Sequence, residues 1–225
     1  MPHRTLPGTR LRVLLDVVMP ALSRSTGRMW AADPVRDVYL SWLRTSYDMV
    51  RATVPLLRAA QEESARRADP ISSRLLTYLP RQIRDEDGHD AWVADDYVTA
   101  GGSAEDLRER VPSAAVARLV GSQYYWIRHA HPIALLGHTA VLEWYPPPGE
   151  LASMLARRSG LPAGAFRTLS RHSSLDGGHG EALAGFLDSL PLSAAQRRLL
   201  TRSALASVAG LAETAAEVVN ARGRG

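Results

Sequence analysis

The sequence contains no cysteine and no lysine, and only two phenylalanines. Without cysteine the chain can form neither a disulfide framework nor a thiolate metal site, so a metal site must be built from histidine and carboxylate side chains. No apolar run approaches the roughly 20 residues that span a bilayer, and no signal peptide is visible, so we predict a cytoplasmic protein without membrane contact. Strand-type alternation, internal repeats and low-complexity segments are also missing, which leaves an all-α fold.

The composition is that of one soluble domain. The 225 residues are 45% apolar, which is enough for a sizeable core. The formal charge is +4, with 27 basic residues that are all arginine, but the 23 acidic residues are mixed through the chain. Because neither a long basic run nor an aromatic platform is present, we expect no nucleic-acid partner.

Helical periodicity predicts a single-domain bundle of about seven helices. Residues 1–30 are interpreted as an N-terminal extension with one helix, and residues 31–221 as a metal-binding helical domain. The first helix is expected over residues 11–22, where leucine and valine recur at helical spacing. It should end near the Ser-Arg-Ser-Thr-Gly cluster at residues 23–27.

Capping residues and prolines mark the other helices. Asp33 and Asp69 each precede a proline, which is the pattern of an N-cap followed by proline at the first helical position. Ser113 is expected to cap another helix, and Ser193 with Gln196 forms a capping-box pattern. Prolines inside the periodic segments predict a kink at Pro55, a bend or a split at Pro80 and an interruption at Pro132.

The segment 171–179 carries two histidines and a carboxylate at helical spacing. His172, Asp176 and His179 lie at offsets of 0, 4 and 7, so a helix places them on one stripe. Two imidazoles and one carboxylate are typical ligands of iron. A solvated polar stripe is the alternative, but apolar residues flank the stripe at helical spacing, and buried polar groups without partners cost several kcal/mol. Gly177-Gly178 indicates a close approach of another backbone or a local distortion.

Two further signals lie upstream. Glu86 and His89 are three residues apart and are expected to share a helix face, as in the Glu-x-x-His motif of di-iron carboxylate proteins. The alternative is an exposed acidic turn, since three aspartates surround them. Glu143 is a carboxylate in an otherwise apolar helix, although it could be half exposed near the helix end. His138 lies about 140° round that helix from Glu143 and is not expected to share its metal, while His131 is expected to be a core or helix-bend residue.

In this order the motifs resemble the heme-oxygenase-like di-iron oxidases, many of which are described as iron-containing redox enzymes. The matching pieces are residues 85–89, 123–125, 131–132, 142–146 and 172–179. The resemblance spans roughly residues 35–215, and its most specific motif is the last one. It implies a heme-oxygenase-like bundle of about seven helices, in agreement with the periodicity.

By position, the resemblance implies that six side chains ligate iron: Glu86, His89, Glu143, His172, Asp176 and His179. Three histidines and three carboxylates suit two Fe(II) ions, because imidazoles fix each metal and carboxylates bridge them. Members of the family usually add a carboxylate from the first core helix. Asp48 is the tentative choice because its helix should line the core, whereas Glu62 and Glu63 fall in a charged stretch. Without this ligand the second iron would be labile.

The resemblance implies a non-heme oxidase or oxygenase of small-molecule biosynthesis that uses O2 as co-substrate. Its reaction would be N-oxygenation of an amine, or oxidative decarboxylation or C–C cleavage of an amino or fatty acid. Two alternatives stay open: a metal-free relative similar to thiaminase II or pyrroloquinoline-quinone synthase, and a non-catalytic helical interaction domain. The thiaminase needs a nucleophilic cysteine, which this sequence lacks. The substrate, an external reductant and a homodimer are left open.

Overall fold

The computed structural model describes residues 6–220 of the chain, and the side chains of residues 6–171 and 180–220. This part of the chain is all-α and contains no strand. Its helices are α1 (Pro7–Ala31), α2 (Val35–Val50), α3 (Thr53–Ala65), α4 (Pro70–Glu86), α5 (His89–Thr99), α6 (Ala104–Glu109), α7 (Ala114–His129), α8 (Leu135–Trp144), α9 (Leu151–Ser159), α10 (Arg167–Asp188) and α11 (Ala194–Asn220), with the 3₁₀ helices η1 (Pro132–Ala134) and η2 (Ala163–Phe166). The predicted all-α bundle is confirmed.

The helices are more numerous than the seven predicted because several long segments are divided. The segment around Pro55 is two helices, α2 and α3, and Pro55 lies in the first turn of α3, where a missing amide hydrogen is tolerated. Pro132 likewise opens η1 between α7 and α8. Pro80, however, lies inside α4, so the helix is not split there. In contrast, α1 continues to Ala31, so the predicted helix end at residues 23–27 is wrong.

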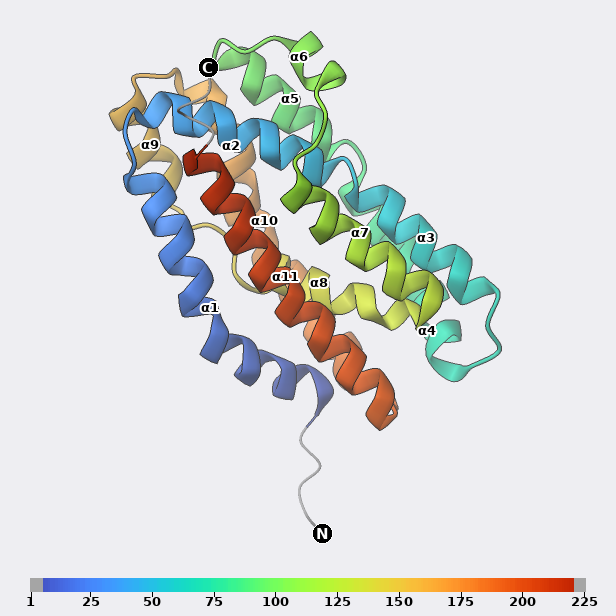
Figure 1. Ribbon diagram of the computed structural model, residues 1–225. Helices are drawn as coiled ribbons and strands as arrows, with labels where there is room; N and C mark the ends of the chain where they lie inside the picture. The colour runs from blue at the N-terminus through green and yellow to red at the C-terminus, as the bar shows by residue number, and fades with distance from the viewer. Residues whose placement is uncertain (1–5, 221–225) are drawn as a thin grey trace.

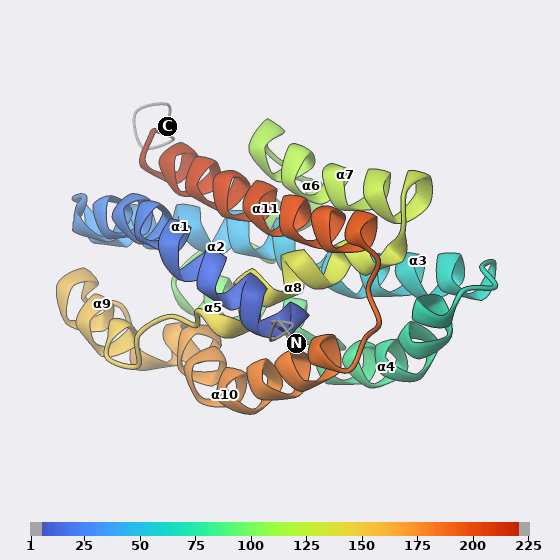
Figure 2. The same cartoon turned by 90° about the horizontal axis from the view of Figure 1, so that it is seen from below.

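The bundle is arranged around α8. Figure 2 shows α8 between α11 on one side and α10 on the other, and α8 contacts both helices. In Figure 1, α1 runs beside α11 along the same side of the molecule. Leu11 and Leu15 of α1 are buried in the same apolar cluster as Leu136 of α8 and Leu183 of α10. The first helix therefore contributes directly to the main core, and the division into residues 1–30 and 31–221 stays a prediction.

Most of the predicted caps are confirmed. Ser113 accepts a hydrogen bond from the amide of Val116 at 3.2 Å, at the start of α7. Ser193 and Gln196 form the reciprocal bonds of a capping box, at 3.2 and 2.9 Å. Asp33 does not cap α2: the helix begins at Val35 after Pro34 and has no side-chain cap bond, so that prediction is wrong.

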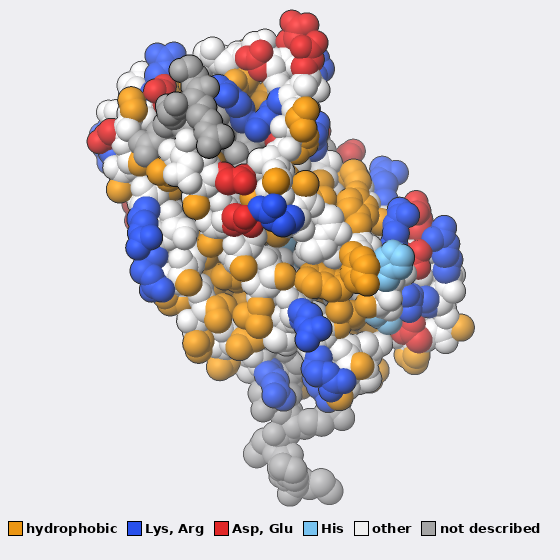
Figure 3. All heavy atoms as spheres, viewed as in Figure 1, with side chains coloured by type: hydrophobic (Ala, Val, Ile, Leu, Met, Phe, Trp, Pro, Cys, Tyr) orange, Lys and Arg blue, Asp and Glu red, His pale blue; other side chains and the backbone are white. Residues whose placement is uncertain are grey.

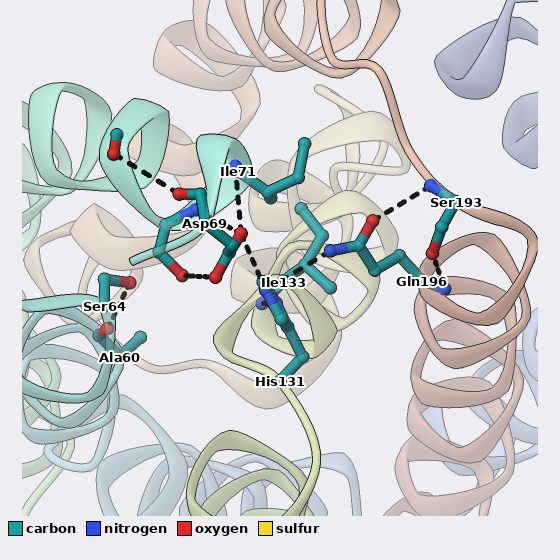
Figure 4. A network of polar contacts seen from close by, with 10 residues as sticks. Ala60, Ser64, Asp69, Ile71, His131, Ile133, Ser193 and Gln196 are labelled. Atoms are coloured by element: carbon teal, nitrogen blue, oxygen red, sulfur yellow. Dashed lines mark hydrogen bonds and ion pairs between the residues drawn. The ribbon is translucent and has the colours of Figure 1, made fainter. Parts of the chain in front are cut away.

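Asp69 caps α4, and through His131 it is linked to the start of η1 and to Gln196 at the start of α11 (Figure 4). Its Oδ1 accepts hydrogen bonds from the amides of Ile71 and Ser72, both at 3.0 Å, and lies 3.3 Å from Nε2 of His131. The other ring nitrogen of His131 accepts a bond from the amide of Ile133 at 3.1 Å, at the start of η1. His131 is therefore a buried residue at a helix bend, as predicted.

The surface agrees with the composition. On the face shown in Figure 3, arginine side chains are dispersed, with acidic side chains between them, and no single basic patch covers the described part of that face. No helix in the described range has the length and apolar character that a bilayer crossing requires.

Candidate metal centre

Glu86 and His89 lie on either side of a helix break, not on one helix face. Glu86 is the last residue of α4, and His89 is the first residue of α5. Between them, Gly88 adopts a φ of 83°, a left-handed conformation that favours glycine. The predicted continuous Glu-x-x-His helix is therefore wrong, but the side chains still meet: Oε2 of Glu86 lies 3.0 Å from Nδ1 of His89.

His89 is held in a buried position. Its side chain is 7% exposed, and that of Glu86 is 18% exposed, so neither lies on the exposed acidic turn that was the alternative. The ring of Trp92 packs against the imidazole with a centroid distance of 4.1 Å. The guanidinium of Arg171 lies over the Trp92 ring, 4.4 Å from its centroid. This stack brings α10 next to His89.

Glu143 lies near the end of α8, where α8 and α10 touch. It is buried, with 7% of the residue exposed. The indole Nε1–H of the next residue, Trp144, donates a hydrogen bond to the carbonyl of Gly180 at 2.8 Å. A β-carbon at Gly180 would lie 3.2 Å from the Glu143 carbonyl oxygen, so the two backbones are close here because residue 180 is glycine.

The start of α10 is fixed by a carboxylate from α5. The amide of Thr168 donates to Oδ2 of Asp96 at 2.7 Å, and Nε of Arg167 donates to its Oδ1 at 3.4 Å. Asp96 is fully buried. A carboxylate at a helix N-terminus satisfies free amides and favours the helix dipole. The helix that carries the third predicted motif is thus anchored to the helix that carries His89.

The backbone of residues 172–179 therefore connects two fixed points. At one end, Arg171 stacks on Trp92 beside His89, and at the other end Gly180 packs against Glu143. The side chains of His172, Asp176 and His179, as well as the pair Gly177-Gly178, lie outside the described side chains. Their role as ligands stays a prediction.

A cavity of about 310 Å³ opens beside Glu86 and Glu143. Helices α1, α2, α3, α4, α7, α8, α10 and α11 all contribute to its wall. The wall is mostly leucine, valine, methionine and aromatic residues, with Trp42 and Tyr145 among them. Within the described side chains, Glu86 and Glu143 are the only charged residues that line it. The cavity thus has two carboxylates in a mostly apolar wall, which is typical of a small-molecule site.

The chain matches the sequence model of a family described as iron-containing redox enzyme, over residues 40–211. The match covers most of the chain. The chain belongs to the iron-containing redox enzyme family. No curated protein matches it.

Solved structures agree with this family on the fold. A domain of unknown function with a heme oxygenase-like fold from Shewanella denitrificans has a TM-score of 0.75 at 13% identity, with 93% of each chain covered. A TenA homolog from Pseudomonas syringae has a TM-score of 0.66 at 11% identity, covering 91% of this chain and 92% of that one. A TenA homologue from P. horikoshii has a TM-score of 0.53 at 13% identity, covering 90% and 98%. At these identities the likeness shows a heme-oxygenase-like fold.

Iron suits the chemistry of the donors that this member of the iron-containing redox enzyme family places in and beside the cavity. Glu86, His89 and Glu143 supply carboxylate and imidazole donors, which non-heme Fe(II) accepts. All three are largely removed from solvent, and both carboxylates face one cavity. The described side chains alone do not form a group of three that could hold a metal ion. A complete ligand set therefore needs donors from elsewhere, and the backbone of residues 172–179 passes between His89 and Glu143.

Asp48, the tentative ligand from the first core helix, is engaged elsewhere. Its carboxylate is fully buried and lies 3.4 Å from a guanidinium nitrogen of Arg51 and 3.4 Å from one of Arg110. It is not among the residues that line the cavity. Two cationic partners do not favour a ligand role for Asp48. Glu62 is exposed, as the composition of that stretch indicated, whereas Glu63 is 16% exposed and pairs with Arg66 at 2.7 Å; neither residue lines the cavity.

Three polar residues of this region were not predicted as site residues: Tyr78, Gln82 and His138. Gln82 is buried and lines the cavity one turn before Glu86. Burial raises the pKa of Tyr78 well above its usual range, and the charge of Glu143 raises it further. On α4 the polar residues Tyr78, Gln82 and Glu86 follow one another at intervals of four residues and so share a helix face. The sequence could therefore have indicated Tyr78 and Gln82 from their spacing to Glu86. His138 lines the same cavity as Glu143 from the preceding part of α8.

Proposed function

We propose that this chain is a non-heme, iron- and O2-dependent oxidase or oxygenase of small-molecule biosynthesis. The observation that carries the proposal is the pair Glu86 and Glu143, the only charged side chains among the described residues of an otherwise apolar cavity. Glu86, which pairs with His89 at 3.0 Å, and Glu143 supply carboxylate and imidazole donors beside an otherwise apolar cavity. Donors of this kind are what non-heme Fe(II) accepts.

The proposed ligands are Glu86, His89, Glu143, His172, Asp176 and His179, for two Fe(II) ions of which the second is labile. When bound, Fe(II) supplies the electrons that activate O2. The residues of the chain have three tasks around it. Glu86, His89 and Glu143 bind and orient the metal, the Trp92 ring restrains the His89 imidazole, and the apolar wall excludes water and positions the substrate.

The proposed substrate is an amine, an amino acid or a fatty-acid-like molecule that undergoes N-oxygenation, oxidative decarboxylation or C–C cleavage. The volume of about 310 Å³ fits a molecule of that size. Turnover would draw on an external reductant where the reaction itself does not return iron to Fe(II). We place the reaction in the cytoplasm.

The alternative is a metal-free enzyme like the TenA homologues, or a non-catalytic helical domain. The likeness to the TenA homologues shows the fold alone, and a thiaminase-like mechanism needs a cysteine that the chain lacks. Anaerobic loading with Fe(II), removal of free metal and exposure to O2 distinguish these cases. The proposal predicts O2 consumption and a change in the visible spectrum on mixing. A loaded and desalted protein that neither consumes O2 nor changes its spectrum would support the alternative.

A further inference from the structure

His138 lies in the cavity wall and is not one of the proposed iron ligands. It lies on α8, five residues before Glu143, and both residues line the cavity. Five helical residues span about 7.5 Å along a helix axis, so His138 is more than one helical turn from Glu143. Thr139, the next residue, also lines the cavity, and its hydroxyl donates to the carbonyl of Leu135 at 3.1 Å, whereas Leu135, Leu142 and Leu211 present apolar side chains.

The hydrogen bonds behind His138 determine which ring nitrogen carries the proton. The hydroxyl of Ser207 donates to the carbonyl of Ser203 at 2.9 Å, because a carbonyl can only accept. Its single proton is thereby used, so the Ser207 oxygen accepts from Nδ1–H of His138 at 2.9 Å. The side-chain Nε2 of Gln123 also donates a hydrogen bond to the Ser207 oxygen, at 3.5 Å. The network therefore holds His138 with its proton on Nδ1.

The other nitrogen, Nε2, then carries a lone pair. Burial lowers the pKa of His138 to about 4, so the ring is neutral near pH 7 and Nε2 acts only as an acceptor. No hydrogen bond from any described residue reaches Nε2. His138 is a partly exposed residue and is part of the cavity wall, so a molecule in the cavity can contact it.

We propose that Nε2 of His138 is the polar anchor of the cavity and accepts a hydrogen bond from a donor group, a hydroxyl or an amine N–H, on an otherwise apolar ligand. Such a ligand would extend from His138 toward Glu86 and Glu143. A carboxylate has no matching group here, because it offers only acceptors and no arginine is among the described lining residues. Calling this ligand the substrate rests on the proposed function, whereas its binding does not require iron.

The test compares two isomers of one formula on metal-free protein in the presence of a chelator. Decan-1-ol offers a hydroxyl donor, and 1-methoxynonane offers only an ether acceptor at nearly the same shape. Binding is followed by calorimetry or by the fluorescence of Trp42, which lines the cavity. We expect decan-1-ol to bind roughly 5- to 10-fold more tightly, the worth of one hydrogen bond, and decanoate to bind more weakly than decan-1-ol. Equal binding of the two isomers, or decanoate binding as tightly as the alcohol, would overturn the proposal.

Variants locate the effect. His138→Phe removes the acceptor and is expected to reduce the isomer preference to about one, whereas His138→Gln keeps an acceptor and retains part of it. Ser207→Ala releases the Nδ1 proton and is expected to weaken the preference without removing the ring. His129→Phe, at an exposed position on α7, is the control and should leave the preference unchanged. If His138→Phe does not fold, Ser207→Ala and His138→Gln test the proposal. An isomer preference that is unchanged in Ser207→Ala and completely lost in His138→Gln would contradict it.

The outcome separates this inference from the function proposed above. A clear isomer preference in a protein that never retains iron would support the anchor and refute the oxidase. Iron retention without an isomer preference would support the oxidase and refute the anchor.

Discussion

The indole of Trp144 donates a hydrogen bond to the carbonyl of Gly180 at 2.8 Å, and this bond ties α8 to α10 beside Glu143. The two residues are 36 positions apart in sequence, and both adjoin predicted ligands, Glu143 and His179. A β-carbon at position 180 would lie 3.0 Å from Cδ1 of the indole. The spacing of α8 and α10 beside the proposed metal centre therefore depends on a glycine that carries no chemistry of its own.

Replacement of Gly180 tests this close contact. Gly180→Ala places a methyl group against the Glu143 carbonyl and the Trp144 ring, so the helices must separate by a few tenths of an ångström. The matched control is Gly185→Ala in the same helix, where a β-carbon meets nothing within 4 Å. Alanine favours a helix over glycine, so the control should stabilise the protein by up to about 1 kcal/mol. We expect Gly180→Ala to be less stable than the control by about 1–3 kcal/mol in urea unfolding, and equal stability would contradict the contact.

Asp96 is expected to contribute strongly to stability. Its buried carboxylate accepts from the Thr168 amide and from Arg167, and Asp96→Ala leaves both donors without that acceptor. We predict a loss of about 2–4 kcal/mol in the free energy of unfolding. Asp95→Ala is the control, because the Asp95 side chain is 67% exposed and lies 3.8 Å from Arg167; exposed pairs of this kind contribute less than about 1 kcal/mol. Similar losses in the two variants would show that the cap on α10 is unimportant.

Asp48 is predicted to stabilise the fold without binding iron. Asp48→Ala would leave Arg110 without its buried counter-charge, at a cost of about 2–4 kcal/mol. Iron per folded chain should stay at the level of the unmodified protein, measured after equal loading. A variant that folds normally but loses one iron would instead identify Asp48 as the ligand from the first core helix.

Asp69 predicts a pH dependence of stability. Burial alone would raise the pKa of its carboxyl, but hydrogen bonds from the side chain and amide of Ser72, together with His131, outweigh burial and lower the pKa to about 2. The unfolded value is about 3.9, so the folded state favours the ionised form. Its contribution is therefore complete above about pH 5 and is lost as the pH falls toward 2. The difference in unfolding free energy between the unmodified protein and Asp69→Asn should shrink from pH 6 to pH 2.5, and a difference that stays constant would contradict this assignment.

Local signals predicted the parts of the fold that local chemistry controls. The caps at Asp69, Ser113 and Ser193 involve side chains within three residues of the amides that they accept from, so the sequence alone reveals them. The all-α class follows from periodicity in the same way. The prediction of one helix through Glu86 and His89 was wrong because the apolar periodicity continues across residues 87 and 88. In the structure the helix is interrupted there, at Gly88 with its positive φ.

Long-range partners could not be read from the sequence. The ion pair of Asp48 with Arg110 joins residues 62 positions apart, and it favours a structural role for Asp48 over the predicted ligand role. The proton position on His138 depends on Ser207, 69 residues later. In both cases the residue type was visible, but the group that determines its chemistry comes from another helix.

Iron content per chain tests the central claim most directly. The protein is loaded with Fe(II) without oxygen, desalted and assayed for metal, beside His179→Ala, Glu143→Gln and the control Glu62→Gln at an exposed position. We predict up to two irons per chain in the unmodified protein and in the control, and little or none in His179→Ala and Glu143→Gln, with the helical circular dichroism of both variants retained. An unmodified protein that retains no iron, or ligand variants that retain as much as the control, would contradict the assignment of this site as a metal centre.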